Sequence, residues 1–262
     1  MTIAGSDPSG GAGLQADLKT FAALKVYGLS VITAVIAQNS ARVVRVEPVT
    51  PEMVAAQLET IVAERVPDAL KIGALGSAAV ANVIAKKLRS LRLPAPVLDP
   101  VLVASSGTRL LEPAGESILR TQLIPLAALV TPNIPEAEVL SGIEIDGLMA
   151  MHQAAQTLHK LGARTLLIKG GHWPAKMGTR RPAKIIDLFF DGCRFIEFAA
   201  ARIPGDGAHG TGCALSAAIA AWLSRGADLR TAISRAKRFM TTVLEKPLML
   251  GKGRWVLDHF AH

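Results

Sequence analysis

Aromatic residues are scarce in this sequence, where they make up 4% of 262 residues and include a single tyrosine. A surface that stacks single-stranded nucleic acid combines aromatic with basic side chains, and no segment of the sequence does so. The formal net charge of +8 therefore predicts a dispersed basic surface that attracts small anionic substrates, with no nucleic-acid partner. Because 50% of the residues are hydrophobic and only 19% are charged, the chain can bury a substantial core and is not expected to be disordered.

Uninterrupted apolar runs of about 20 residues, which a membrane-spanning helix needs, are also absent. The N-terminal sequence MTIAGSDPSGG lacks the basic and apolar regions of a signal peptide. Cys193 and Cys213 are the two cysteines; they allow one disulfide, but nothing indicates secretion. We therefore expect a cytoplasmic protein with reduced thiols and no membrane partner.

Short apolar runs alternate with helical patterns along the chain, which predicts parallel strands joined by helices. The predicted strands cover residues 2–4, 31–37, 69–72, 96–98, 127–130 and 165–168. The predicted helices cover residues 14–27, 51–66, 77–91, 114–122, 148–161, 210–225 and 229–244. A hairpin over 185–199 turns at Asp191 and Gly192. No linker or repeat interrupts this pattern, so we expect one α/β domain over residues 1–262.

Reactive polar residues follow several predicted strands, in the runs IAGSD, VLDP, LVTPN and LIKGGH. The carboxyl ends of parallel strands lie at one edge of a sheet, where ligands bind. The residues brought together in this way are Asp99, Asn133, Glu136, Lys169 and His172. Ordinary turn chemistry explains any one of them, but the set as a whole favours a ligand site.

The segment GDGAHGTGCALSAAIAAWL places Gly207, Gly210 and Gly212 before a strongly apolar helix. Backbone N–H groups at such a helix start bind an anion such as phosphate, although tight packing of the helix on the sheet also explains the glycines. Cys213 lies in the first turn, where the helix dipole should lower the pKa of its thiol and make it a general base or nucleophile. A buried, inert cysteine is the alternative, and Cys193, in a predicted strand, is expected to be inert core.

A second glycine-rich loop, within AGSDPSGGAGLQADLKTF, joins the first predicted strand to the first predicted helix. Asp17 falls in the first turn of that helix, where a solvated charge that favours the helix dipole is the simplest interpretation. Gln38 ends an apolar strand. A polar amide in that place needs partners, which a heterocycle with donor and acceptor atoms would supply.

The segment TPNIPEAE holds Asn133 and Glu136, with a helix expected to begin between them. An amide and a carboxylate at this spacing suit a hydrated magnesium ion near phosphates. A helix start with Pro135 in its first turn accounts for the acidic residues equally well. The polar, basic segment 172–184 is either a flap over a nucleotide or a surface loop.

Six motifs in order along the chain, AGSDPSGGAGLQADLKTF, VITAVIAQN, LDPVLVASSG, LVTPNIPEAE, LIKGGH and HGTGCALSAAIAA, resemble those of hydroxymethylpyrimidine/phosphomethylpyrimidine kinases. The resemblance covers nearly the whole chain. It implies a ribokinase-like three-layer αβα sandwich with a mostly parallel central sheet. It also implies phosphorylation of 4-amino-5-hydroxymethyl-2-methylpyrimidine, and then of its monophosphate to the diphosphate, with ATP and Mg²⁺ in thiamine biosynthesis.

The resemblance further implies roles for individual residues. The positions that match the surroundings of the pyrimidine are Gly5, Ala12, Asp17, Gln38 and Val101. The positions that match the catalytic centre are Cys213 as the base, and Gly210, Thr211 and Gly212 as the anion hole for the transferring phosphoryl group. The positions that match the nucleotide side are Asn133 and Lys169 at the nucleotide phosphates, and Asp99 and Glu136 near the metal and phosphates.

Ala74 departs from the family pattern, in which Met commonly follows KIG and lines the pyrimidine pocket. A larger pocket keeps pyridoxal or pyridoxine kinase open as an alternative, because those enzymes share the fold and act on similar heteroaromatic alcohols. A pyrimidine sensor without turnover is a second alternative, which the intact set of Asp99, Glu136 and Cys213 disfavours. Relatives usually form dimers, so the resemblance also implies a homodimer.

Overall fold

The computed structural model describes residues 1–104, 106–172, 184–202, 208–250 and 255–261. Its main sheet has nine strands in the order β3-β2-β1-β4-β5-β6-β7-β8-β9. These strands are β1 (Thr2–Ser6), β2 (Ser30–Gln38), β3 (Val43–Pro48), β4 (Lys71–Ile72), β5 (Val97–Leu98), β6 (Leu129–Val130), β7 (Leu166–Ile168), β8 (Lys184–Phe190) and β9 (Phe195–Ala201). The pairings from β2 to β7 are parallel, and those that add β3, β8 and β9 are antiparallel. The predicted mostly parallel sheet is confirmed.

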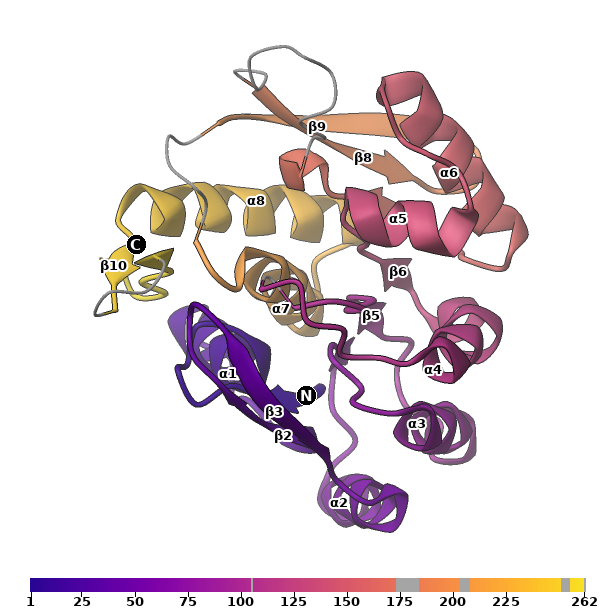
Figure 1. Ribbon diagram of the computed structural model, residues 1–262, viewed down its shortest axis with the longest axis vertical. Helices are drawn as coiled ribbons and strands as arrows, with labels where there is room; N and C mark the ends of the chain where they lie inside the picture. Colours follow the sequence, from indigo (N-terminus) through magenta and orange to yellow (C-terminus); the bar gives the residue numbers. More distant parts are fainter. Residues whose placement is uncertain (105, 173–183, 203–207, 251–254, 262) are drawn as a thin grey trace.

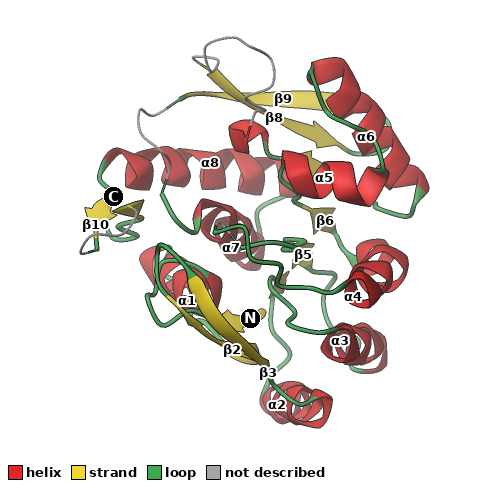
Figure 2. Cartoon of the chain, in the orientation of Figure 1, coloured by secondary structure: helices red, strands yellow, loops and turns green. Residues whose placement is uncertain are grey.

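Helices cover both faces of this sheet (Figures 1 and 2). One face is covered by α1 (Gly13–Ala23), α7 (Thr211–Ser224) and α8 (Leu229–Glu245). The other is covered by α2 (Pro51–Glu64), α3 (Ala78–Ser90), α4 (Pro113–Ile118), α5 (Ile134–Ser141) and α6 (Leu148–Lys160). The result is the three-layer αβα arrangement that the family resemblance implies.

Each short central strand contributes side chains to the hydrophobic core on both sides of the sheet. In β5, Val97 packs in the cluster beneath α7 and α8, whereas its neighbour Leu98 packs in the cluster beneath the opposite helices. Leu129 and Val130 of β6 divide in the same way. Side chains of successive strand residues point to opposite faces, so a strand covered on both sides needs apolar residues at every position.

Side-chain caps account for where several helices begin. Thr50 accepts a hydrogen bond from the backbone N–H of Met53, and Pro51 occupies the first helical position of α2. Ser77 caps α3, and Asp228 caps α8. A side-chain acceptor at this position satisfies an N–H group that the helix itself leaves unpaired.

Some predicted boundaries were wrong. The helix expected over 14–27 ends at Ala23, because Lys25 adopts a left-handed φ of 58°. The helix expected over 114–122 is α4 followed by a π-helical turn (Leu119–Leu123) and a 3-10 turn (Ile124–Leu126). β3 and the small pair β10 (Leu248–Met249) and β11 (Trp255–Val256) were not predicted. These strands are largely exposed and so lack a continuous apolar run.

The prediction that Cys193 forms part of the core was also wrong. This residue lies in the turn between β8 and β9, where its N–H donates to Asp191 Oδ1 at 3.0 Å, and its side chain is exposed instead of forming core. The hairpin itself is confirmed, with its turn around Asp191 and Gly192. The polar turn residues set where the strand ends, so Cys193 falls just outside it.

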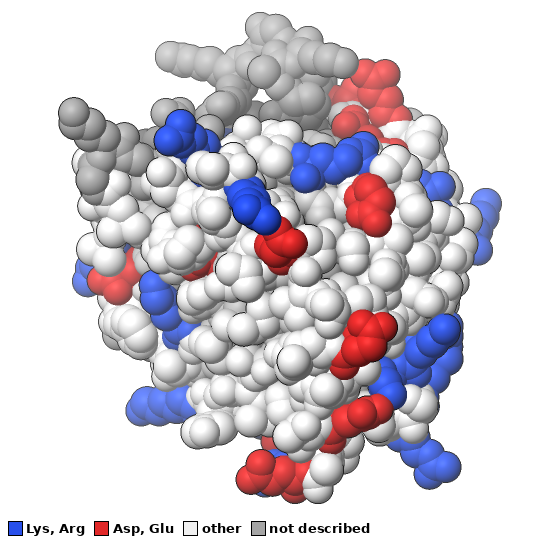
Figure 3. Space-filling model, turned by 60° about the horizontal axis from the view of Figure 1, so that its bottom comes forward, with Lys and Arg blue, Asp and Glu red and all other residues white. Residues whose placement is uncertain are grey.

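Charged side chains are scattered over the face in Figure 3, with acidic groups among the basic ones. Among the described helices, none combines the length and the apolar character needed to cross a membrane. A third short helical turn, η3 (Gly170–His172), follows β7 at the carboxyl edge of the sheet.

Candidate active site

The N-terminus of α7 is built on a glycine that no other residue can replace without strain. Gly210 caps the helix with a left-handed φ of 83°. A Cβ added there would lie 1.8 Å from the carbonyl oxygen of Gly11. The two glycine-rich loops are therefore in direct backbone contact, and Thr211 and Gly212 open the helix beside this contact. The first N–H groups of a helix have no intrahelical partner, so this end of α7 can receive an anion.

A histidine that sequence reasoning missed ties these loops together. His209 Nε2 lies 3.2 Å from Asp7 Oδ2, and its backbone N–H donates to the carbonyl of Trp255 at 2.7 Å. Asp7 also accepts from the backbone N–H groups of Ser9 and Ala12. Burial opposes ionisation of Asp7, but these hydrogen bonds, His209 foremost, lower the pKa of its carboxyl. The signal was present in the sequence, since His209 directly precedes the GTGC motif.

A cavity of about 850 Å³ opens at the carboxyl ends of the parallel strands. Twelve of the thirteen residues to which the resemblance assigns a role line it: Gly5, Ala12, Gln38, Asp99, Val101, Asn133, Glu136, Lys169, Gly210, Thr211, Gly212 and Cys213. The side chain of His172, predicted at the same edge, lies outside the part of the chain that the structure describes. Ala74 and Ile36 lie at the same end of the cavity as Gln38 and Gly5. The structure thus brings together residues that are more than 200 positions apart in the chain.

Asp17 does not line the cavity, so the predicted contact between its side chain and a substrate was wrong. Its side chain is 0% exposed and is not part of the cavity wall. Lys71 Nζ lies 2.7 Å from Asp17 Oδ2, and Thr2 Oγ1 donates to the same oxygen at 2.6 Å. The alternative of a solvated helix-capping charge was also wrong. α1 packs on the sheet with Asp17 pointing inward, because Lys71 in β4 offers it a buried partner.

Cys213 lies in the first turn of α7 with its side chain partly exposed at the cavity wall. Burial raises the pKa of its thiol to about 11; Lys71 and a hydrogen bond from the backbone of Gly13 lower it, while Asp99 and Asp17 raise it further. The predicted lowering of this pKa by the helix dipole was therefore wrong. Desolvation and two nearby carboxylates outweigh the favourable groups.

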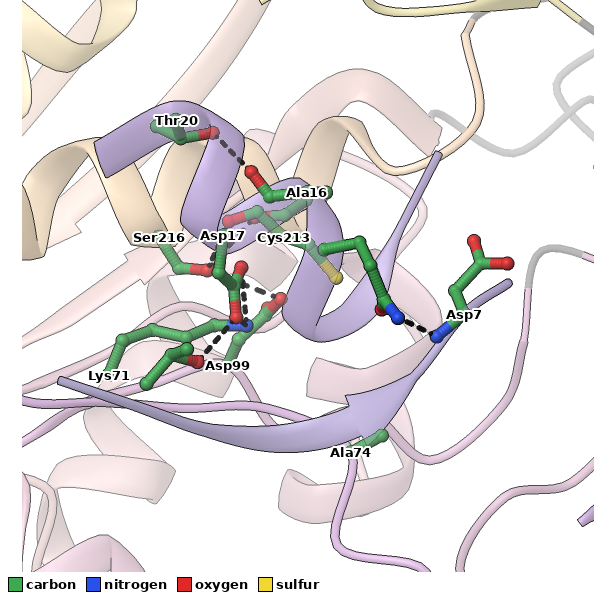
Figure 4. A network of polar contacts seen from close by, with 12 residues as sticks. Asp7, Ala16, Asp17, Thr20, Lys71, Ala74, Asp99, Cys213 and Ser216 are labelled. Atoms are coloured by element: carbon green, nitrogen blue, oxygen red, sulfur yellow. Dashed lines mark hydrogen bonds and ion pairs between the residues drawn. The ribbon is translucent and has the colours of Figure 1, made fainter. Parts of the chain in front are cut away.

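Asp99 and Lys169 form a buried ion pair at the floor of the cavity. Lys169 Nζ donates to Asp99 Oδ1 at 2.6 Å. Thr131 Oγ1 lies 3.3 Å from the same oxygen, and Ser216 Oγ lies 3.5 Å from Oδ2 (Figure 4). Burial alone would lower the pKa of Lys169, but Asp99 and Glu136 raise it. The ammonium is therefore protonated at neutral pH and presents a fixed positive charge to the cavity.

Glu136 and Asn133 form a capping box at the start of α5. The Asn133 N–H donates to Glu136 Oε2 at 2.8 Å, and the Glu136 N–H donates to Asn133 Oδ1 at 2.9 Å. The interpretation of this segment as a helix start, with Pro135 in its first turn, is confirmed. Both residues also line the cavity. Burial raises the pKa of Glu136 to about 7, although Lys169 lowers it.

Replacement of Glu136 by glutamine is expected to stabilise the protein at pH 8 by on the order of 1–3 kcal/mol, with little effect at pH 5. Since the pKa of Glu136 is raised from 4.5 to about 7 by folding, its ionisation removes stability as the pH rises through that interval. Glutamine keeps the oxygen that caps α5. Urea unfolding at both pH values measures the difference, with the exposed Glu52→Gln as control. An equal effect at pH 5 and pH 8 would contradict the prediction.

The carboxylates do not form a closed metal site. No cluster of three or more acidic, histidine or cysteine side chains that could hold a metal ion occurs among the described residues. The Asp99 carboxylate is already engaged by Lys169, Thr131 and Ser216. This arrangement favours ion pairing over direct coordination by Asp99.

A second ion pair, missed by sequence reasoning, lines the far end of the cavity. Lys237 Nζ donates to Asp187 Oδ2 at 2.5 Å, and the Gly170 N–H donates to Asp187 Oδ1 at 2.9 Å. Lys237 lies on α8, and the pattern of charges on this helix predicts an ordinary exposed face. The flap predicted over 172–184 falls almost wholly outside the described residues.

A model of the phosphomethylpyrimidine kinase family matches residues 7–258. The chain belongs to this family. A hydroxymethylpyrimidine/phosphomethylpyrimidine kinase of Rhizobium meliloti is 44% identical over 263 residues, which cover 99% of this chain and 96% of that protein. The thiamine biosynthesis bifunctional protein ThiED of Geobacter sulfurreducens is 45% identical over 259 residues. The chain spans 51% of the length of that bifunctional protein.

Among solved structures, an ADP complex of Bacillus subtilis pyridoxal kinase superposes with a TM-score of 0.88 at 36% identity, covering 99% of this chain and 96% of that one. The predicted ribokinase-like fold is confirmed. Kinases named for different substrates, pyridoxal and phosphomethylpyrimidine, thus share both the fold and substantial sequence identity with this chain. The identity of the substrate must therefore be argued from the cavity.

Proposed function

We propose that this kinase transfers the γ-phosphoryl group of ATP to the hydroxymethyl group of 4-amino-5-hydroxymethyl-2-methylpyrimidine, and then to the resulting monophosphate, for thiamine biosynthesis. The observation that carries the proposal is one cavity that joins Gln38, Cys213, the start of α7 and Lys169. The family match and the Rhizobium meliloti relative support the same activity. Release of ADP in the presence of the pyrimidine alcohol, followed by a coupled assay, tests it.

The pyrimidine binds at the end of the cavity formed by Gly5, Ala12, Gln38 and Val101. A glutamine side chain carries both a donor and an acceptor, which matches the ring nitrogens and amino group of an aminopyrimidine. Gly5 lets Ile36 pack closely against the backbone at this end of the cavity, since a Cβ there would lie 3.0 Å from Ile36 Cδ1 and 3.7 Å from Ala74 Cβ. This placement directs the hydroxymethyl group toward Cys213.

Phosphoryl transfer depends on positioning and on charge stabilisation. The N–H groups at Gly210, Thr211 and Gly212 receive the phosphoryl oxygens, and Lys169 supplies a positive charge beside them. A Cβ added at Gly212 would lie 3.0 Å from Lys169 Nζ, so this ammonium is close to the start of α7. As the thiolate, Cys213 takes the proton of the attacking hydroxyl while the new O–P bond forms and the bond to ADP breaks, and it becomes a neutral thiol.

Magnesium would bind together with the nucleotide. A magnesium ion that keeps several waters and binds mainly through phosphate oxygens needs few protein ligands, which fits a site whose Asp99 is paired with Lys169. When bound, the ion neutralises charge on the phosphates. Asn133 and Glu136, at the start of α5, face the same part of the cavity and would contact its water shell and the nucleotide phosphates.

Pyridoxal is the second candidate substrate, because Ala74 widens the cavity beside Gly5. Replacing Ala74 with methionine, the residue common in the family at this position, is expected to lower kcat/KM for pyridoxal by about tenfold or more through overpacking. The smaller pyrimidine should lose less than threefold, roughly within what a tolerated core change costs. Parallel kinetics with both substrates measure the two ratios. Equal losses would show that Ala74 does not set selectivity.

Residues 1–262 are proposed to act as a single kinase domain, since one continuous sheet carries every segment of the cavity. A homodimer is proposed from the family resemblance, and exposed Val35 and Val44 near the β3 edge of the sheet offer apolar contact area. Sedimentation equilibrium tests it. Two free cysteines support a reducing compartment such as the cytoplasm.

A further inference from the structure

His209 is a buried polar residue that the proposed phosphoryl transfer does not use. It directly precedes Gly210, is buried, and forms part of the cavity wall. Its ring Nδ1 is buried and has no hydrogen-bond partner among the described residues. An unpaired buried polar atom lowers stability, so packing alone does not explain a histidine in this place. The other ring nitrogen, Nε2, makes the contact that distinguishes this side chain.

The contact of Nε2 is with a carboxylate that already organises the first glycine-rich loop (residues 7–12). Nε2 lies 3.2 Å from Asp7 Oδ2. The same oxygen accepts from the Ala12 N–H at 2.8 Å, and Asp7 Oδ1 accepts from the Ser9 N–H at 2.9 Å. A carboxylate only accepts hydrogen bonds, so the ring carries its proton on Nε2 and donates it to Asp7. One buried carboxylate therefore holds both this loop and His209.

The backbone of His209 is held by a third segment, β11. Its N–H donates to the carbonyl oxygen of Trp255 at 2.7 Å, and His209 pairs with Val256 in a parallel bridge. A Cβ added to Gly11 would lie 2.7 Å from His209 Cδ2 and 3.0 Å from Val256 Cγ1. The imidazole is thus packed between the first loop and β11, with Nε2 directed at Asp7.

These contacts join the two ends of the site that must be aligned for the reaction. Ala12 belongs to the cavity wall at the pyrimidine end, and Thr211 belongs to the anion-binding start of α7. The two backbones meet where Gly210 packs against the Gly11 carbonyl. That van der Waals contact limits how closely the segments approach, whereas a hydrogen bond also fixes their direction. A misplacement of about 1 Å can cost roughly 10²-fold in rate.

We propose that His209, through its hydrogen bond to Asp7, is a positioning residue that aligns the first glycine-rich loop with the start of α7 for phosphoryl transfer. It does not exchange a proton with the substrate. The inference rests on the proposed function for the identity of the groups that the two segments bind. It assigns a role to the histidine before the GTGC segment and to the aspartate of the first loop together.

His209→Met removes the donor and keeps a side chain of similar length. It is expected to lower kcat and kcat/KM for the alcohol together, by about 10- to 100-fold, because the alignment matters in the transition state. KM for ATP should stay within about threefold, since Lys169 and Asn133 are untouched. His209→Gln places an amide N–H near the position of Nε2 and should restore kcat to within roughly fivefold.

His159→Met is the matched control. The ring of His159 also makes one hydrogen bond, from Nδ1 to the Ala163 carbonyl at 2.7 Å, but it lies on α6 and is not part of the cavity wall. This variant should keep the kcat of the wild-type protein. Thermal unfolding identifies any variant that fails to fold, and the shorter His209→Asn replaces His209→Met if that variant does not fold.

A double-mutant cycle with Asp7→Asn tests the contact itself. Because both substitutions disrupt one hydrogen bond, His209→Met should lower kcat by less than about threefold in the Asp7→Asn background, whereas independent effects would multiply. Hydrogen exchange of the backbone N–H groups of residues 9–12 provides a measurement without turnover. Exchange should be faster in His209→Met and return toward the wild-type rate in His209→Gln.

Full kcat in folded His209→Met, a rise in KM alone, equal losses in the Met and Gln variants, or multiplying losses in the cycle would each overturn the proposal. The kinetics use whichever alcohol, the pyrimidine or pyridoxal, the wild-type protein phosphorylates faster. Rejection of the pyrimidine as substrate would therefore leave the result for His209 standing. Should neither alcohol be phosphorylated, the proposed function fails, and unchanged hydrogen exchange in His209→Met would separately overturn the role of His209.

Discussion

Replacement of Cys213 by alanine is expected to lower kcat for phosphorylation of the pyrimidine alcohol by about 10²- to 10⁴-fold, the usual contribution of a general base. KM for ATP should change little, because Lys169 and the start of α7 remain in place. Cys193→Ser is the matched control, since Cys193 is exposed in a hairpin turn away from the cavity. Full activity of the Cys213→Ala variant would exclude Cys213 as the base.

The same variant is expected to affect the second phosphorylation much less, by under about tenfold. A phosphate monoester carries a charge of roughly −1.5 to −2 at neutral pH, so its attacking oxygen has no proton for Cys213 to remove. Initial rates with the alcohol and with the monophosphate as separate substrates give the two ratios. An equal loss in both steps would indicate that Cys213 positions the acceptor and does not remove its proton.

Gly210→Ala is expected to lower the free energy of unfolding by about 3 kcal/mol or more. The added Cβ would meet the Gly11 carbonyl at 1.8 Å, and a φ of 83° disfavours any side chain. Relief of the clash would separate the two glycine-rich loops and displace the N–H groups at the start of α7. Any folded fraction should therefore lose about 10²- to 10³-fold in kcat, as expected for loss of an oxyanion-type donor.

The variant Gly226→Ala distinguishes the cost of a left-handed backbone conformation from the cost of the steric clash at Gly210. Gly226 has a similar φ of 81°, but an added Cβ would meet nothing within 4 Å. Its cost is expected to be about 1–2 kcal/mol, the strain of a left-handed conformation alone, with unchanged kcat. Equal destabilisation by the two variants in urea unfolding would contradict the account of Gly210.

The carboxyl ends of the parallel strands were predictable because each central strand is a short apolar run followed by a polar residue. That pattern alone predicts that Asp99, Asn133, Glu136 and Lys169 lie at one edge of the sheet. The glycines before α7 were predictable for the same reason, since an anion site at a helix start is a local feature of backbone and sequence.

Pairing between distant side chains was not predictable. In the sequence, Asp17 has the features of a solvated charge in the first turn of a helix. Lys71 is only the first residue of the segment KIG, and nothing there indicates a buried charge. Only the packing of α1 on β4 brings them to 2.7 Å. The pKa of Cys213 was misjudged because a helix start is visible in the sequence, whereas burial and two carboxylates from other elements are not. His209 was missed because its partner Asp7 lies 202 positions away.

The two-step kinase reaction is the central claim, and a time course with ATP, Mg²⁺ and the pyrimidine alcohol, analysed by mass spectrometry, tests it most directly. The account predicts that the monophosphate appears first and then declines as the diphosphate accumulates, with one ADP released per phosphoryl group, while pyridoxal offered in parallel is a poor substrate. Efficient phosphorylation of pyridoxal with no pyrimidine diphosphate would contradict it.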